Sequence, residues 1–445
     1  MVSIVRTKKP AENKERVTTD DKGSKLMLDL DFARTIDDQK SVLNYSNPGK
    51  GDIGNPFLSI LQKTDDSFST WSGAVSYNHK ISSAHQFKTG ADIYFLTSEN
   101  DFFHGELESD EYMSDPLKSN RFDAKENYLG VYFTSINRWN DKLTTNLGVR
   151  SEYLYRRGEQ KTNGKIREDK DFVLLPSFSL NYTPNGSHSF SLSLSTSKIR
   201  PNLNNLNSFV YYLSPTVYYE NNADLKAANR FSSFVQYVLK GHYVFNVMYL
   251  TSEIMTGFRS PLENGCTLRT TESFGRQHTG ILGLSYNNSF FENSLSVNAN
   301  FDGCWERYYG TFETLHVDVS SLHLQMSFKA SWKIPFINQM SIGTSCRYLT
   351  AYEQADAKTN PSYSLSFWGQ KELGSDISLR FGVDHLVSKL SQKIYTATNY
   401  YSMEEQDFNF KSFYIQLTVP FGRKKVSGAT WHSGSSSIGK NRIVK

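Results

Sequence analysis

The sequence has few cysteines, no long apolar run and no excess of charge of one sign. Cys266, Cys304 and Cys346 lie far apart and form no CxxC pair, which excludes a disulfide framework and a zinc cluster of the usual spacing. Lys and Arg number 49 against 45 Asp and Glu, a balance too even for a nucleic-acid-binding domain. The mean hydropathy is -0.51, and no apolar stretch reaches the roughly 18 residues of a spanning helix, so a helical membrane protein is excluded.

Motifs for catalysis are also missing. The chain has no HExxH, no Walker loop and no GxSxG elbow, and its 10 histidines do not fall at metal-ligand spacings. His323 alternates with apolar residues, which favours a side chain on a polar face over a ligand. We therefore expect no catalytic residue, no metal and no cofactor. The first 20 residues are charged and lack the apolar core of a secretory signal peptide.

What the sequence does contain is strict alternation of apolar and polar residues, the pattern of a strand with two different faces. Around residue 324, for example, Leu324 and Met326 share one face while His323 and Gln325 share the other. The apolar positions are predicted to face lipid. The residues predicted to face lipid are Phe190, Leu192, Leu194, Leu322, Leu324, Met326, Phe328, Ile377, Leu379, Phe381, Phe413, Ile415, Leu417, Val419 and Phe421.

The pattern predicts about 16 strands, most of them at least as long as the roughly 9–11 residues that a tilted strand needs to cross a bilayer. The predicted ranges are 24–36, 69–80, 85–97, 124–138, 141–155, 171–183, 187–198, 229–240, 242–255, 267–287, 293–305, 316–332, 339–350, 362–372, 376–386 and 408–421.

The links between these strands are predicted to alternate, with about ten residues or more at one end and about six or fewer at the other. Such sorting is typical of an up-and-down membrane barrel, in which tight periplasmic turns face long extracellular loops. The short links carry turn residues such as Asn185-Gly186 and Lys240-Gly241. We therefore expect a periplasmic segment at 1–23, an outer membrane barrel at 24–421 and a disordered polar periplasmic tail at 422–445.

In hydrocarbon each unpaired backbone N–H or C=O costs several kcal/mol, and a closed sheet leaves no edge with unpaired groups. The fold class predicted is thus all-β, an antiparallel up-and-down transmembrane β-barrel. Barrels of 16–18 strands leave an aqueous channel, whereas 22-stranded transporters carry a plug. The chain is interpreted either as part of a 22-stranded barrel or as a barrel closed by itself.

Residues 190–260 resemble the barrel region of the TonB-dependent receptor-like outer membrane β-barrel family of Bacteroidetes. The matching features are the Ser/Leu strand, Arg200-Pro201, Leu206-Asn207, a Tyr-rich loop and Asp224-Leu225-Lys226. The ending, Val419-Pro420-Phe421-Gly422 with a basic tail, is also similar. Ser208, Ala223 and Ala227 stand where the family usually has proline. The resemblance covers roughly residues 70–445.

The resemblance implies a large barrel with an N-terminal plug that engages TonB and imports a large or scarce ligand. The expected partners are outer membrane lipid, the barrel assembly machinery, which reads the aromatic-ended last strand, and TonB if a plug region exists. About 23 residues precede the first predicted strand, too few for a plug, so the chain is interpreted as the C-terminal barrel portion of a receptor.

Three loops carry ligand hypotheses. The aromatic loop 209–219 is the best candidate because aromatic faces stack on sugars or planar chelates, although the same residues could pack over the barrel rim. The acidic loop 105–115 either binds Ca²⁺ or, as we favour, is solvated. The basic hairpin 156–170 either grips an anionic polysaccharide or carries ordinary mixed charge. The predicted ligand-binding residues are Phe209, Tyr211, Tyr212, Tyr218 and Tyr219.

Two further functions remain open. A self-sufficient 16-stranded diffusion porin also has an even strand number. A soluble all-β carbohydrate-binding or adhesive protein would pack alternate faces sheet on sheet.

Overall fold

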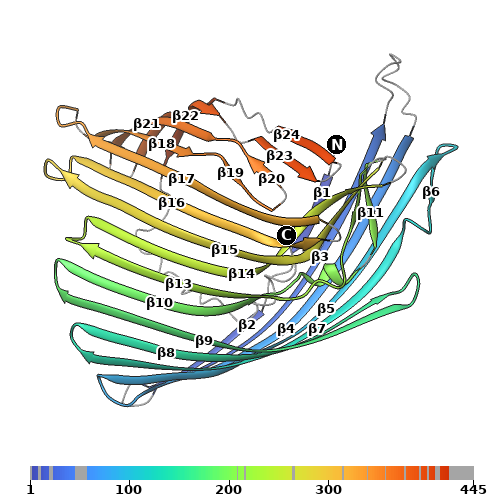
Figure 1. Ribbon diagram of the computed structural model, residues 1–445, viewed down its shortest axis with the longest axis horizontal. Coiled ribbons are helices and arrows are strands. Elements are labelled where there is room, and N and C mark those ends of the chain that lie inside the picture. Colours follow the sequence, from blue (N-terminus) through green and yellow to red (C-terminus); the bar gives the residue numbers. More distant parts are fainter. Residues whose placement is uncertain are drawn as a thin grey trace.

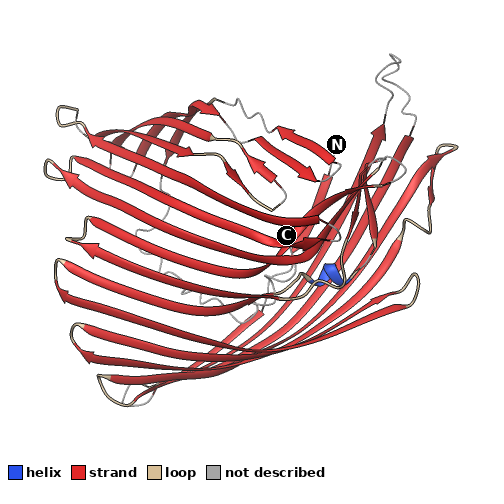
Figure 2. Ribbon diagram, in the orientation of Figure 1, coloured by secondary structure: helices blue, strands red, loops and turns tan. Residues whose placement is uncertain are grey.

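The computed structural model is almost entirely β-strand (Figure 2). It describes residues 3–8, 12–19, 24–45, 58–207, 209–214, 217–262, 266–312, 315–337, 339–355, 357–374, 377–389, 392–397, 400–405 and 411–419. Within these ranges, no helix is long and apolar enough to cross a membrane.

Most strands of the described residues belong to one sheet of 21 strands. In chain order these are β1 (Ser3–Lys8), β2 (Glu12–Thr19), β3 (Lys25–Tyr45), β4 (Leu58–Lys80), β5 (His85–Glu108), β6 (Glu111–Ser114), β7 (Asn120–Asn140), β8 (Leu143–Gln160), β9 (Lys165–Asn185), β10 (His188–Ile199), β11 (Val210–Ser214), β12 (Val217–Glu220), β13 (Ala228–Leu239), β14 (Tyr243–Pro261), β15 (Thr267–Phe290), β16 (Leu295–Phe312), β17 (Leu315–Lys333), β18 (Met340–Leu349), β21 (Ser362–Gly374), β22 (Ile377–Lys389) and β25 (Ser412–Thr418). A second sheet contains β19 (Tyr352–Glu353), β20 (Ala357–Thr359), β23 (Gln392–Ala397) and β24 (Tyr400–Glu405), and η1 (Leu203–Leu206) is one turn of 3-10 helix.

Each long strand from β3 onward pairs antiparallel with the next long strand of the chain, the up-and-down order that the sequence predicts. In Figure 1 the sheet curves round from β3–β7 on the right, through β8–β17 on the left, to β21 and β22 at the top. One edge is formed by β1 and β2, which both pair with β3, and the other by β25. In the described part of the chain, no pairing joins the two edges.

The two faces of the sheet differ as the alternation requires. Phe32, Trp71 and Phe95 lie opposite one another on β3, β4 and β5, and Trp71 and Phe95 are exposed. One residue along, Ser72 and Tyr94 are opposite one another and buried. Because a step of one residue reverses the face of a strand, the sheet has an apolar outer face and a more polar inner face.

The residues predicted to face lipid lie on the outer face of their strands. Leu322, Phe328, Phe381, Phe413 and Ile415 are exposed there. Phe190, Leu417 and Val419 are also exposed, while Leu192, Leu194, Leu324, Met326, Ile377 and Leu379 are half-buried between neighbouring side chains. Phe421 lies outside the described residues. Contact of this set with lipid stays a prediction.

All sixteen predicted strands are present, but many are longer than predicted at the end opposite the tight turns. β4 begins at Leu58 instead of residue 69, and β3 ends at Tyr45 instead of residue 36. The prediction that every second link has about ten residues or more is therefore wrong: β8 and β9 are joined by residues 161–164. The tight turns at the opposite end, such as 81–84 and 186–187, lie where the sequence predicts them.

The prediction that residues 1–23 lie outside the barrel is wrong for 3–8 and 12–19, which are strands of the sheet. Thr19 pairs with Lys25 near the turn, whereas Ser3 pairs with Lys40, so β1 begins at the end of the sheet that carries the long loops. The alternation misses these strands because their only apolar residues are Ile4, Val5 and Val17, too few to form a period of two. Residues 420–445, including the predicted tail, lie outside the described residues.

Two loops fold against the inner face. The link from β10 to β13 carries η1, which lies beside the inner surface of β7. The second sheet reaches β17, where the rings of Tyr352 and His323 lie 4.9 Å apart and the backbone N–H of Glu353 donates to Ser321 Oγ at 3.0 Å. His323 is buried on the inner face, in agreement with the prediction of a polar-face side chain.

Candidate functional site

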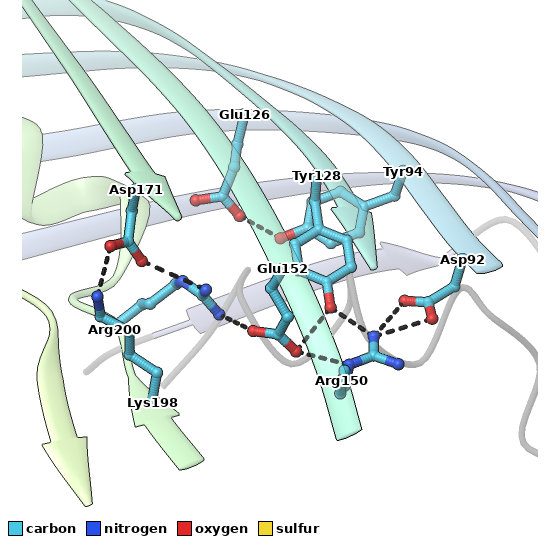
Figure 3. Close-up of polar contacts among 9 residues, drawn as sticks. All are labelled: Asp92, Tyr94, Glu126, Tyr128, Arg150, Glu152, Asp171, Lys198 and Arg200. Atoms are coloured by element: carbon cyan, nitrogen blue, oxygen red, sulfur yellow. Dashed lines mark hydrogen bonds and ion pairs between the residues drawn. The ribbon is translucent and has the colours of Figure 1, made fainter. Parts of the chain in front are cut away.

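Arg150 is the centre of a polar network on the inner face of β5, β7 and β8 (Figure 3). Its Nη2 donates to both carboxylate oxygens of Asp92, at 2.8 and 2.7 Å, and its Nε donates to Glu152 Oε1 at 2.7 Å. Asp92 and Glu152 are buried. Because charged hydrogen bonds of this kind are short and directional, they fix the guanidinium in place and tie β8 to β5 across β7.

Two tyrosines extend the network along the inner face of β5 and β7. Tyr128 Oη accepts from Arg150 Nη2 at 2.5 Å and donates to Glu152 Oε1 at 2.8 Å. The ring of Tyr94 stacks on Tyr128 at 4.9 Å and 12°, and its hydroxyl donates to the fully buried Glu126 at 2.5 Å. Each phenol therefore combines ring packing with a hydrogen bond.

Arg200 ties the start of the inward loop, residues 200–207, to this network. Its Nη1 donates to Glu152 Oε2 at 2.7 Å, and its Nη2 lies 3.3 Å from Asp171 Oδ2. Asp171 also pairs with Lys198 (Figure 3). Both arginines thus share Glu152, so the position of the loop is coupled to the side chains of the wall.

The inward loop buries its apolar residues against the same wall. Leu203 and Leu206 of η1 are almost fully buried, and Pro201 precedes them, its carbonyl accepting from Arg156 Nη1 at 3.4 Å. The cluster they form is completed by Tyr94, Leu96, Phe122, Ala124, Tyr128 and Leu154. Burial of apolar surface contributes about 25 cal/mol for each Å² removed from water. This packing therefore holds the inward loop against the inner face of the sheet.

Gly130 leaves the space that Arg150 occupies. A Cβ on Gly130 would overlap Arg150 Nη2 and lie 2.7 Å from Tyr128 Oη. We expect Gly130→Ala to lower the free energy of unfolding by about 1–3 kcal/mol, because Arg150 would leave its partners. Gly303→Ala is the control, since its Cβ meets nothing nearer than 3.8 Å. Urea titration of the refolded protein in lipid vesicles measures both, and equal losses would show that Arg150 moves aside at no cost.

The predicted aromatic ligand residues follow the inward loop. Phe209 is buried, and its ring lies 5.9 Å from Phe102 and 5.3 Å from Tyr211. Burial raises the pKa of Tyr211, and its hydroxyl accepts from Asn207 Nδ2 at 3.1 Å. This end of the aromatic loop is packed, which restricts how much of Phe209 a ligand can contact.

The other predicted aromatic residues lie on the hairpin β11–β12. Tyr211 pairs with Tyr219, and Tyr212 with Tyr218. Tyr218 and Tyr219 are half-buried, and Cys266 Sγ donates to Tyr218 Oη at 3.3 Å. The side chain of Tyr212 lies outside the described set. β12 also pairs in parallel with β15, which attaches the hairpin to the wall.

The acidic and basic loops form internal ion pairs. Lys118 Nζ lies 2.5 Å from Glu106 and 3.2 Å from Asp115. Burial would raise the pKa of Asp115, but the Leu117 N–H and Lys118 outweigh it and lower that pKa. Arg157 pairs with Glu159 and Glu168, as the mixed-charge interpretation predicts. Within the described residues, no three His, Cys, Asp or Glu side chains gather as a metal site.

Within the predicted strand 141–155, Arg150 and Glu152 alternate with the apolar Val149 and Tyr153, which assigns both to the polar face. The sequence predicts neither the network nor the inward loop. The available signal was the pair Arg200-Pro201 directly after a strand, because proline ends strand pairing. No pattern in the sequence joins Arg200 to Glu152, which lies in a different hairpin.

Comparison with known proteins agrees with the fold. The model of the outer membrane protein beta-barrel family matches residues 17–419. No curated protein matches the chain at a significant level.

Solved structures share the architecture at low identity. In the complex of FpvAI with pyocin S2, 12% of residues are identical, the TM-score is 0.55, and the match covers 87% of this chain and 54% of the other. The siderophore receptor PiuA from Acinetobacter baumannii is 11% identical with a TM-score of 0.57, and the match covers 88% of this chain and 62% of PiuA. The copper transporter OprC is 14% identical with a TM-score of 0.59, and the match covers 87% of this chain and 61% of OprC.

The chain thus spans less than two thirds of each of these proteins, and the likeness concerns the fold alone. PiuA is a receptor and OprC a transporter, not enzymes. The family match covers most of the chain and identifies an outer membrane protein, which removes the soluble alternative. This chain belongs to the outer membrane protein β-barrel family.

Proposed function

We propose that the chain is the C-terminal part of the barrel of a TonB-dependent receptor of the Bacteroidetes type, which takes up a ligand too large or too scarce for diffusion. The support is the strand pattern, the inward loop and the likeness to a siderophore receptor and a copper transporter that are longer than this chain. TonB would contact a plug region of the same receptor. The barrel assembly machinery would read the last strand, and outer membrane lipid would surround the outer face.

The direction of the edge strands carries this proposal. β1 and β2 run antiparallel to β3, and β25 runs antiparallel to β22. Following the alternation from β3 to β25, β25 runs in the same direction as β1 and β2. A single-chain bacterial barrel has an even number of strands, all antiparallel, so these two edges do not complete such a ring by themselves.

An odd number of further strands would complete an antiparallel ring, as expected for a part of a larger receptor barrel. The self-sufficient 16-stranded porin is the second candidate, and it would require β1 and β2 to leave the sheet. In the receptor, the hairpin β11–β12 with Tyr218 and Tyr219 would offer aromatic surface to an arriving ligand.

TonB dependence tests the proposal. Cells that carry the full gene with all its coding sequence should lose ligand-dependent growth both when TonB is deleted and when residues 200–445 are removed. A porin would instead give TonB-independent uptake, and residues 1–445 alone would form a steady channel in planar bilayers. That result would contradict the receptor assignment.

A further inference from the structure

A pocket of about 720 Å³ lies above η1 at the end of the sheet that carries the long loops. Its walls come from the ends of β8 and β9, from the segment 220–224 and from β15, and the buried side chains of Phe122 and Leu206 line its base. Cavities of about 300–1,000 Å³ hold small ligands. The pocket is separate from the Arg150 network, although both contact the inward loop.

A bulge turns β15 toward this pocket. Ile254 pairs with Gly275 and Met255 with Ser273, so Phe274 is an extra residue in β15. A bulge shifts the alternation by one position, so the residues on its N-terminal side, including Glu272, face the interior. Without the bulge Glu272 would lie on the outer face.

Opposite charges occupy different walls of the pocket. Lys165 and Arg167 are on β9, whereas Glu220 ends β12 and Glu272 is on β15. Arg167 is already paired with Asp224, and Glu272 Oε2 accepts from Asn222 Nδ2 at 2.6 Å. Among the described residues, Lys165 and Glu220 form no ion pair, so one cation and one anion on different walls are available to a ligand.

Asn221 is a polar residue in the wall of the same pocket. It is only 8% exposed, yet its side chain has no hydrogen bond among the residues that the structure describes. Its amide atoms are not fully buried, so they reach the space of the pocket. A ligand that both donates and accepts hydrogen bonds, as a peptide group does, would satisfy the amide.

We propose that this pocket binds a short linear peptide with free termini. The peptide carboxylate pairs with Lys165, its ammonium group with Glu220, and a peptide group with Asn221. A neutral oligosaccharide satisfies Asn221 but leaves Lys165 and Glu220 without a charged partner. The proposal rests on the proposed receptor function only in that the pocket opens to an arriving ligand.

Isothermal titration of the full-length protein, purified in detergent from outer membranes, tests the proposal with triglycine as the probe. We expect N-acetyl-triglycine amide, which has no terminal charges, to bind at least about tenfold more weakly than triglycine, because charged hydrogen bonds are roughly twice as strong as neutral ones. Lys165→Gln and Glu220→Gln should each reduce triglycine affinity by about tenfold or more.

Matched controls lie on the outer face of β9. Lys170→Gln and Glu168→Gln remove the same charges outside the pocket and should leave the affinity unchanged. Heat-modifiable migration on gels confirms that each variant folds. Equal binding of triglycine and its capped form, or tighter binding of maltotriose, would overturn the proposal. TonB-dependent growth is scored separately, so loss of the peptide site and loss of the receptor function are distinguishable.

Discussion

Replacing Arg200 by alanine is expected to lower the free energy of unfolding by about 3 kcal/mol, the lower end of the cost of removing one partner of a buried ion pair. The lower end applies because Arg150 still pairs with Glu152 and Lys198 with Asp171. The charges left are Glu152 and Asp171, whose carboxylates lie 2.7 and 3.3 Å from the guanidinium. The side chain of Arg200 is only 10% exposed, so water replaces it poorly. Urea unfolding in lipid vesicles, followed by tryptophan fluorescence, measures the loss.

Arg269→Ala is the matched control, because Arg269 is exposed and its loss should change stability by about 0.5 kcal/mol or less. Proteolysis provides a second readout: the segment 200–227 should become cleavable in Arg200→Ala when the barrel strands are still protected. If both arginine variants lost the same small amount, Arg200 would not anchor the inward loop.

Introducing a charge on the outer face gives the second large effect. Leu324→Arg is expected to cost roughly 2–4 kcal/mol if the side chain lies near the bilayer midplane, because an arginine there meets hydrocarbon. Leu324 lies on the outer face of β17, opposite Gly303 of β16. Equilibrium unfolding from vesicles measures the difference from the unsubstituted protein.

Gln325→Arg is the control for this prediction. Gln325 is the next residue, faces the interior and is exposed, so an arginine there stays hydrated and should cost far less. Two equal costs would show that the assigned faces of β17 are wrong.

The strand positions and their faces are predictable from the sequence because lipid and water impose a period of two. This holds for β17, where Leu322 and Phe328 lie on the outer face and His323 on the inner face. The alternation of apolar and polar residues is lost where both faces of a strand contact water. The first half of β4 and the last part of β3 contain Asp37, Asp38, Asp65 and Asp66, and they are strands that the pattern does not show.

The candidate site is predictable only in part. Polar positions such as Arg150 and Glu152 follow from the alternation, but their partners do not, because Asp92 and Arg200 belong to other hairpins. The inward direction of residues 200–207 depends on Leu203 and Leu206 packing against β5, β7 and β8. Such packing depends on the curvature of the whole sheet, which a single segment does not encode.

The outer face of the sheet should contact lipid while the inner face is wet. Cysteines placed one at a time at residues 190–195 of β10, in a variant with the three native cysteines replaced by alanine, distinguish the two faces. Positions 191, 193 and 195 should react with a charged, membrane-impermeant thiol reagent, while 190, 192 and 194 should not. Equal reactivity at all six positions, or the reverse alternation, would contradict this assignment of the two faces.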